Sequence, residues 1–529
     1  MKKSLTIIMI LVLFGLSTSM VKAGTPSDIL VEAWRFDDII SMDPAEMFEI
    51  STYEIVGNVY ETLVTVNPRS PTEIVLRLAE SWKVSKDGRT YTFQLRPGVK
   101  FHSGNPFTAE DVVYSYQRLT ALNKGPAFLI QDIGISADNM KKTLKALGKL
   151  SFQMTVDKSY SPSYVINVLS STNFSVVDSK LVKSHEKDGD WGNGWLKTHS
   201  AGCGPFILKE WRPDELITVD ANPDYYGTPA ILKRIVWRHI PEESSQRLLL
   251  EAGDVDIARN LSADQLEGLM AKGGFQTSST PQTTSMYMGL NCKNKYLAKP
   301  KVREALRWLI DYQGMVKTIL RNKYIINQTF LPNTFFGYLD SNPYRLDVEK
   351  AKALLAEAGV KGGFSLKASV SSTHQDRMDI AQSVQATFAK AGIDLEIQAT
   401  DSKTALTIYR ARKHDIYIGT WGVDYFDPNT NMVFVVNRDN SDDAGSKPLA
   451  WRNSWQDEEL TAKADALLVE KDREKRKAGY QNLIREWQPK SCFAMMFQQI
   501  QVAAHTPALK NFFIGPTAET TLYVGVSKE

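Results

Sequence analysis

The sequence predicts an α/β fold that is divided into more than one domain. The chain has 529 residues, which exceeds what a single hydrophobic core usually supports, so two or three domains are expected. Between residues 347 and 419, segments with helical periodicity alternate with short apolar runs that are typical of strands. Such alternation predicts a sheet covered by helices, and the ligands of these sheets gather at the carboxyl ends of the strands.

Composition describes a globular chain and gives no sign of a nucleic-acid partner. Hydrophobic residues make up 43% of the chain and charged residues 23%. The 63 basic and 60 acidic residues leave a formal net charge of +3, without the excess that binding to nucleic acid needs. Three cysteines, Cys203, Cys292 and Cys492, stand in glycine-flanked or apolar surroundings, which favours buried thiols and leaves a single disulfide as the alternative.

The first 23 residues have the three parts of a secretory signal peptide. Residues 1–3 supply a positive start, residues 5–16 are apolar, and Ala23 is a small residue where a signal peptidase could cut. A run of about a dozen apolar residues is too short to span a membrane, which needs roughly 20. Because no cysteine near the cut offers a site for lipid attachment, we predict a freely diffusing protein in the periplasm of a Gram-negative cell.

Residues 78–119 predict a hairpin followed by a helix. Apolar and polar residues alternate at 80–85 and 91–95, on either side of a turn that contains Asp and Gly. A further short strand is predicted at 99–101, after a Pro-Gly turn. Thr108 then opens a helix whose early acidic residues suit the positive end of a helix dipole.

This unit also carries a family resemblance. Residues 82–112 read W-x-x-S-x-D-G-x-x-Y-T-F-x-L-R-x-G-V-K-F-H-x-G-x-P-x-T-A-x-D-V. The run closely resembles the signature of the extracellular solute-binding proteins of peptide and nickel ABC importers. Residues 202–206, 222–227 and 251–256 resemble further segments of that family, so the resemblance covers the chain broadly. It implies a two-lobed periplasmic binding protein of type II, cluster C, with a hinge and an extra subdomain inserted in the first lobe.

The resemblance also implies how the chain divides between the lobes. After a signal peptide at 1–23, lobe 1 takes residues 24–73, 198–285 and 503–529, the inserted subdomain takes 74–197, and lobe 2 takes 286–502. Two crossings of the chain between the lobes then make a hinge. A protein built in this way can close on a small ligand and bury it away from water.

The remaining elements follow from periodicity and turn residues. In the first lobe and its insertion we expect strands at 29–34 and 64–66 and helices at 53–63 and 162–169. In the second lobe we expect strands at 286–291, 365–369, 394–398 and 415–419, and helices that start at Pro300, at 347 and at 376. The helices at 347–358 and 376–391 are each closed by a glycine. Residues 493–502 would return to the first lobe.

The best candidate for a ligand site follows the strand predicted at 415–419. The next loop is crowded with Trp, Gly, Asp and Pro; taken alone, Trp421 would be buried core and Asp424 a turn or cap residue. In the family that the chain resembles, the pattern W-x-x-D-x-x-D/E-P places an aspartate that pairs with the α-amino group of a peptide, and Asp424 falls on it. The resemblance implies a charge-assisted hydrogen bond from Asp424, with Trp421 as a pocket wall and Thr420 and Gly422 beside them.

Arg377 is the second candidate ligand-binding residue. Dipeptide-binding members of the family that the chain resembles carry an arginine at the start of a comparable helix, where it meets the free carboxylate of the ligand in a bidentate way. The alternative is a solvated arginine of the first helical turn that pairs with Asp376 or Asp379. A binder of longer peptides would not need this arginine.

No enzyme signature was found in the sequence. It contains no G-x-S-x-G, H-E-x-x-H or G-x-x-x-x-G-K-[ST] motif, and its seven histidines have no metal-ligand spacing. We therefore predict no catalytic residues, no metal and no cofactor, although converging Ser/His or carboxylate side chains would keep a hydrolase open.

The resemblance implies a monomeric receptor that binds short peptides and hands them to an inner-membrane ABC permease. Opines or other amino-acid conjugates, oligosaccharides and nickel chelates are alternative ligands for the same fold. A peptide-binding chaperone or surface protein is the alternative from a different class.

Overall fold

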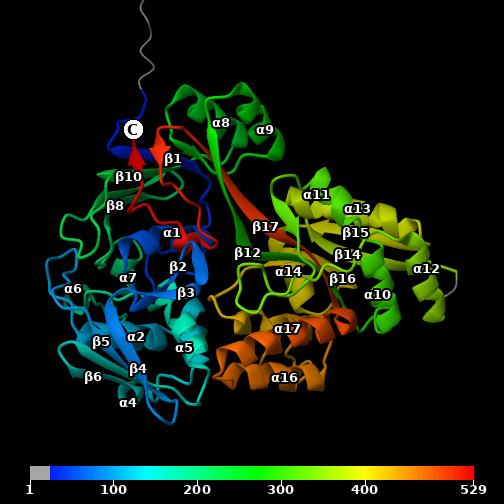
Figure 1. Cartoon of the computed structure of the whole chain (residues 1–529), viewed down its shortest axis with the longest axis horizontal. Helices are drawn as coiled ribbons and strands as arrows, with labels where there is room; N and C mark the ends of the chain where they lie inside the picture. The colour runs from blue at the N-terminus through cyan, green and yellow to red at the C-terminus, as the bar shows by residue number, and fades with distance from the viewer. Residues whose placement is uncertain (1–23, 361) are drawn as a thin grey trace, which may run out of the picture.

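Two long antiparallel strands, β12 (Gln276–Leu290) and β17 (Phe493–His505), run from one lobe of the molecule into the other (Figure 1). The structure is a computed structural model that describes residues 24–360 and 362–529. The predicted signal peptide at residues 1–23 lies outside the described residues. The chain therefore crosses between its two lobes on paired strands.

The ladder between these two strands is broken near the predicted crossing. Its register shifts between Pro281 and Ser285 and again between Met286 and Tyr287. The predicted lobe boundaries at 285/286 and 502/503 fall inside the two strands, and the exact division into lobes stays a prediction.

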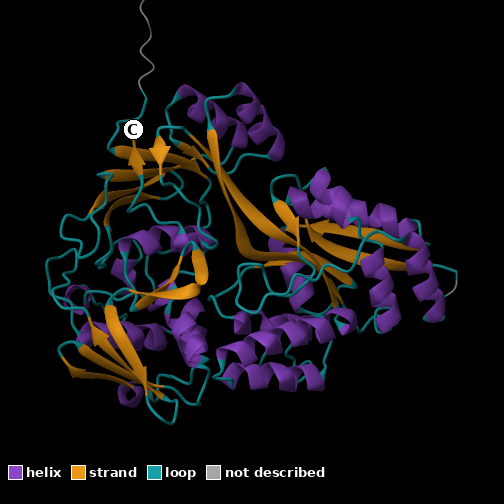
Figure 2. Ribbon diagram, in the orientation of Figure 1, coloured by secondary structure: helices purple, strands orange, loops and turns teal. Residues whose placement is uncertain are grey.

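Within the described residues, an 11-stranded sheet passes through both lobes, and its helical cover confirms the predicted α/β class (Figure 2). Its order is β15-β14-β16-β12-β17-β11-β1-β10-β9-β8, with β13 paired to β17. The strands other than β12 and β17 are β1 (Ile29–Trp34), β8 (Phe206–Arg212), β9 (Leu216–Ala221), β10 (Arg234–His239), β11 (Ile257–Ala258), β13 (Tyr324–Ile326), β14 (Phe364–Ser371), β15 (Ile393–Thr400) and β16 (Ile416–Trp421).

In the second lobe, β14 pairs in parallel with β15 and β16, and β16 then pairs antiparallel with β12. Buried apolar residues of these strands and of the covering helices, such as Leu366, Ile380 and Ile418, form one core. The helices of this core are α10 (Pro300–Trp308), α11 (Tyr312–Lys317), α12 (Val348–Glu357) and α13 (Gln375–Ala389). A second core takes buried residues from α14 (Ser402–Arg410), α15 (Leu449–Arg452), α16 (Glu458–Val469) and α17 (Arg473–Lys490). The strands and helices predicted between 347 and 419 are confirmed, with ends within two residues.

The inserted segment has its own antiparallel sheet, in the order β4-β5-β7-β6, packed on helix α2. These elements are β4 (Ala79–Val84), β5 (Thr90–Leu95), β6 (Leu144–Gly148), β7 (Ser151–Thr155) and α2 (Ala109–Leu122). The helix begins as predicted at Thr108, whose backbone N–H donates to Asp111 Oδ2 at 2.8 Å in a capping box. The edge of Tyr116 packs on Phe152 in the same core, at 5.5 Å between ring centroids.

The first lobe and its inserted segment contain further helices and strands. They are α1 (Ile50–Val59), β2 (Val64–Asn67), β3 (Ser70–Leu76), α3 (Phe128–Gln131), α4 (Met140–Thr143), α5 (Pro162–Leu169), α6 (Ser179–Ser184), α7 (Asn193–Leu196), α8 (Glu243–Ala252), α9 (Ala263–Lys272), β18 (Leu509–Lys510) and β19 (Ser527–Lys528). The short helical turns are η1 (Gly125–Ala127), η2 (Thr172–Phe174), η3 (Pro428–Phe434) and η4 (Ala518–Thr520), of which η3 belongs to the second lobe.

Three predicted elements differ from the structure. The strand predicted at 286–291 is only the last part of β12, which begins at Gln276. The strand predicted at 99–101 is reduced to a single antiparallel bridge between Lys100 and Pro106. The chain turns back directly after it, where Phe101 donates to Asn105 O at 2.9 Å and accepts from Gly104 N–H at 2.8 Å. The helix predicted at 53–63 begins at Ile50 and ends at Val59, where the carbonyl of Val59 accepts from the N–H of Gly204 at 3.0 Å. A Cβ on Gly204 would lie 2.6 Å from the Val59 backbone, so this approach requires glycine.

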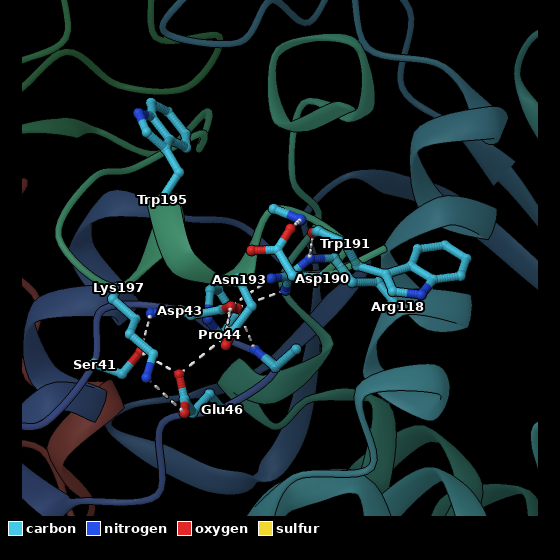
Figure 3. A network of polar contacts seen from close by, with 12 residues as sticks. Ser41, Asp43, Pro44, Glu46, Arg118, Asp190, Trp191, Asn193, Trp195 and Lys197 are labelled. Atoms are coloured by element: carbon cyan, nitrogen blue, oxygen red, sulfur yellow. Dashed lines mark hydrogen bonds and ion pairs between the residues drawn. The ribbon is translucent and has the colours of Figure 1, made fainter. Parts of the chain in front are cut away.

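A buried polar network fastens the inserted segment to the first lobe (Figure 3). Arg118 of α2 donates from Nη1 to Asp43 Oδ1 at 2.6 Å and from Nε to the carbonyl of Trp191 at 2.7 Å. Asn193 donates from Nδ2 to Asp43 Oδ2 at 2.6 Å and to Glu46 Oε2 at 2.9 Å. Both charges of the Arg118–Asp43 pair are buried and compensated, so these segments are held together as one body.

All three cysteines lie within the described residues and are free, with Cys203 and Cys492 buried and Cys292 half-buried. The disulfide left open by the sequence is therefore not formed. In the part of the chain that the structure describes, every helix falls short of the length and apolar character that crossing a membrane requires.

Candidate ligand-binding cleft

The loop after β16 folds back onto the short helical turn η3. Trp421 donates from Nε1 to Asn431 Oδ1 at 3.0 Å, and the backbone N–H of Asp424 donates to Thr430 Oγ1 at 3.1 Å. Asp427 caps the turn by accepting from the N–H of Asn429 at 3.0 Å, with Pro428 at the first position. These bonds hold the loop in one shape and fix the position of Asp424.

The second acidic residue of the loop has a structural partner. Asp427 is buried and receives Nη1 and Nη2 of Arg476, each at 2.7 Å. Nη1 of Arg476 also donates to Ser163 Oγ, at 3.0 Å, on helix α5 of the inserted segment. This compensated pair therefore anchors the loop to α17 and contacts the facing wall of the cleft.

A cavity of about 780 Å³ lies between the loop and the inserted segment. Its walls include Trp421, Gly422 and Asp424 on one side and Phe128, Asp132 and Tyr160 on the other. A smaller cavity of about 230 Å³ shares Phe48, Gly422 and Asp424 with it and extends toward Tyr53, Thr283 and Glu519. Aromatic walls with a few charged groups, at this volume, suit a small polar ligand that has apolar side chains.

The carboxyl of Asp424 has an unusual electrostatic environment. Burial raises its pKa to about 7, the charge of Asp132 adds to this rise, and a hydrogen bond with Thr430 opposes it. The protein atoms packed around Asp132 partly desolvate its carboxyl and raise its pKa to about 6, while the residue stays exposed to water through the open cleft. Among the described residues, no basic side chain lowers the pKa of either carboxyl. Both groups therefore favour a cation that the described residues do not supply.

A third acid lies on the other side of Asp424. Burial raises the pKa of Tyr53, and the charges of Glu519 and Asp424 raise it further. Burial also raises the pKa of Glu519. The smaller cavity therefore also presents acidic groups.

The structure brings some of the predicted site residues to the cavity and leaves others beside it. Asp424, Trp421 and Gly422 line the larger cavity, whereas Thr420 and Arg377 are not among its lining residues. Arg377 donates from Nη2 to Thr420 Oγ1 at 3.1 Å, and its buried Nε has no hydrogen-bond partner in the described structure.

The alternative for Arg377 was an ion pair on its own helix. In the structure, Asp376 instead accepts from the hydroxyl of Tyr324 and from the backbone N–H of Arg377. The roles of all five residues in binding stay predictions.

Sequence reasoning missed the facing wall of the cavity. Phe128, Asp132, Tyr160 and Tyr164 come from short elements and loops between residues 128 and 164, where the hydrophobic periodicity is weak. Their shared position depends on how the inserted segment packs against the loop after β16, including an edge contact of Tyr164 with Tyr425 at 5.8 Å. No local motif signals that arrangement.

Two lobes joined by crossing strands, with a cavity between them, define a two-lobed solute-binding protein. The model of the bacterial extracellular solute-binding proteins, family 5, matches residues 73–443, so the chain belongs to this family. The members of this family are solute-binding proteins rather than enzymes.

Similar proteins include the probable D,D-dipeptide-binding periplasmic protein of Escherichia coli (strain K12), 28% identical over 98% of both chains. The dipeptide-binding protein of the same organism is 26% identical over 68% of this chain and 69% of its own. Among solved structures, a periplasmic binding protein from Helicobacter pylori in complex with the peptide STSA has a TM-score of 0.75 and 25% identity. That match covers 95% of this chain and 98% of the other.

Proposed function

We propose that this protein is the periplasmic substrate-binding component of an ABC importer and captures short peptides between its lobes. One observation carries the proposal: Asp424, a desolvated carboxyl without a basic partner among the described residues, lines a cavity between the lobes. It stands where peptide-binding relatives are expected to hold the α-amino group of the ligand. Two relatives named for dipeptide binding and a solved peptide complex support a peptide as the ligand.

The proposed mechanism is a shift between open and closed lobes. The ammonium group of a peptide forms a charge-assisted hydrogen bond with Asp424, and Trp421 packs against a side chain of the ligand. Because the ligand contacts both walls only when the cleft is closed, binding favours the closed state. Bending takes place in β12 and β17, between lobes with the boundaries given by the sequence analysis.

Arg377 is the proposed partner of the peptide carboxylate. Its unpaired Nε and its Nη2, now bonded to Thr420, offer two parallel donors of the kind that a carboxylate accepts. Thr420 would exchange this bond for one with the ligand, and Gly422 leaves room for the ligand backbone because a Cβ there would meet a single atom, at 3.8 Å.

The proposed setting is the periplasm. The leader is cut near Ala23, the mature protein acts as a monomer, and it releases its ligand to an inner-membrane permease. No cofactor, metal or catalytic residue enters this mechanism.

The test is a thermal-shift screen of the mature protein, refolded to remove ligand carried through purification. The panel holds free di- to pentapeptides, their N-acetylated and C-amidated forms, opines, oligosaccharides and nickel chelates. A ligand at 100 times its Kd stabilises the fold by about 2.7 kcal/mol, a shift of several degrees. We expect free peptides to give this shift, acetylation to abolish it and amidation to weaken it through Arg377. A shift with sugars or chelates alone would refute a peptide ligand.

A further inference from the structure

A second carboxyl, Asp132, faces the cavity from the wall opposite Asp424. It follows the short helix α3, where its backbone N–H donates to Phe128 O at 2.8 Å and its carbonyl accepts from the hydroxyl of Tyr160 at 3.0 Å. Phe128 and Tyr160 themselves also line the cavity. The backbone of Asp132 is therefore fixed, while its carboxylate has no side-chain partner in the described structure.

The cavity wall does not neutralise this pair of acids. Its two basic side chains among the described residues are Lys158 and Arg438. Arg438 forms an ion pair with Asp465, and the ammonium group of Lys158 lies 6.0 Å from the centre of the Tyr160 ring. Neither base attracts Asp132 or Asp424 enough to lower the pKa of its carboxyl. Two negative charges on opposite walls are thus left for the ligand to compensate.

A single ammonium group cannot balance both charges once the cleft is closed. If the α-amino group of the ligand pairs with Asp424, Asp132 remains a desolvated carboxylate that faces the ligand, and this opposes closure. A second cation on the ligand removes that cost and connects the ligand to both walls.

We propose that Asp132 is a specificity-determining residue that binds a cationic side chain of the first residue of the peptide, so the protein selects peptides that begin with lysine or a similar residue. The inference rests on the proposed function and on the placement of Asp424. The aliphatic part of such a side chain can lie against Phe128 and Tyr160, while its ammonium group reaches the carboxylate.

The experiment compares two tripeptides, Lys-Ala-Ala and norleucine-Ala-Ala, by isothermal titration calorimetry. The two ligands have side chains of nearly the same length and differ in the terminal ammonium group. We expect the unmodified protein to prefer the lysine peptide by roughly tenfold or more, as for a charge-assisted hydrogen bond. Asp132→Asn should remove the preference, and Asp132→Glu should retain most of it.

Asp138→Asn is the matched control, because Asp138 is exposed six residues further along the chain and does not line the cavity. It removes the same charge from the same segment and should leave the preference unchanged. Because the preference is measured within one protein, a variant that folds poorly does not hide the result in the unmodified chain.

Equal affinity of the unmodified protein for the two tripeptides would overturn the role of Asp132 alone. A preference that survives Asp132→Asn would do the same. If free peptides of every length failed to bind in the thermal-shift screen, the proposed function would fail with it.

Discussion

The Arg118–Asp43 network and the cleft around Asp424 both contain an aspartate carboxylate, but the carboxylate has a different role in each region. In the network, Asp43 receives an arginine and an asparagine and is completely buried. In the cleft, Asp424 has one hydroxyl partner, no basic one among the described residues, and a second acid opposite. A buried carboxylate with its cation present fastens segments together, whereas one without its cation is free to bind a ligand. The presence or absence of a paired cation therefore distinguishes a structural carboxylate from a ligand-binding one better than the extent of its burial does.

The largest expected effect comes from breaking the compensated pair. Arg118→Ala leaves Asp43 as a buried, uncompensated charge, which should lower the free energy of unfolding by about 3–5 kcal/mol. Asp424→Asn should leave the stability of the unliganded protein unchanged or raise it, because it removes a desolvated charge. Urea denaturation of the two variants measures the difference. Similar losses in both would contradict the distinction between the two regions.

The next effect is on affinity and concerns the cleft alone. Asp424→Asn should weaken the binding of free peptides by about tenfold to a hundredfold, given about 1.5–3 kcal/mol for a charged hydrogen bond. Asp439→Asn is a suitable control, since Asp439 lines the same cavity but is held by Ser441. Calorimetric titration of both variants checks this, and an unchanged affinity after Asp424→Asn would remove Asp424 from the site.

A smaller effect is the pH dependence, which should have opposite signs for the stability of the protein and for its affinity for a ligand. The raised pKa values of Asp424, about 7, and Asp132, about 6, mean that the folded protein holds protons that the unfolded chain releases above about pH 4. The contribution of these groups to stability therefore falls as the pH rises from about 4 to 7.

Binding of a cation should respond in the opposite direction. It needs ionised carboxylates, so affinity for a peptide should fall by about tenfold between pH 6 and pH 5, and binding near pH 6 should release protons. Calorimetry in two buffers of different ionisation enthalpy measures the released protons. Asp424→Asn should reduce the dependence of peptide affinity on pH. If the affinity of the unmodified protein did not change with pH, the two carboxyls would not bind the cation of the ligand.

One wall of the cleft could be predicted from the sequence, and the other wall could not. The loop with Trp421 and Asp424 could be found because a strand, a turn-rich loop and a family motif are contiguous there. Asp132 and Tyr160 could not, because neither belongs to a motif and their place depends on packing between distant segments. The alternating elements of the second lobe were predicted for the same local reasons. The strand expected at 99–101 is instead reduced to a single bridge between Lys100 and Pro106, because the chain turns back directly after it.

The broken ladder between β12 and β17 has a mechanical consequence. Two paired stretches flank residues 282–284, which carry no ladder pairing to β17, so relative rotation of the lobes should concentrate its bending at these three residues. Gln282, Thr283 and Thr284 also line the smaller cavity, next to Asp424. A molecule in that cavity would lie against the bending point itself, so the angle between the lobes and the occupancy of the cavity are expected to change together.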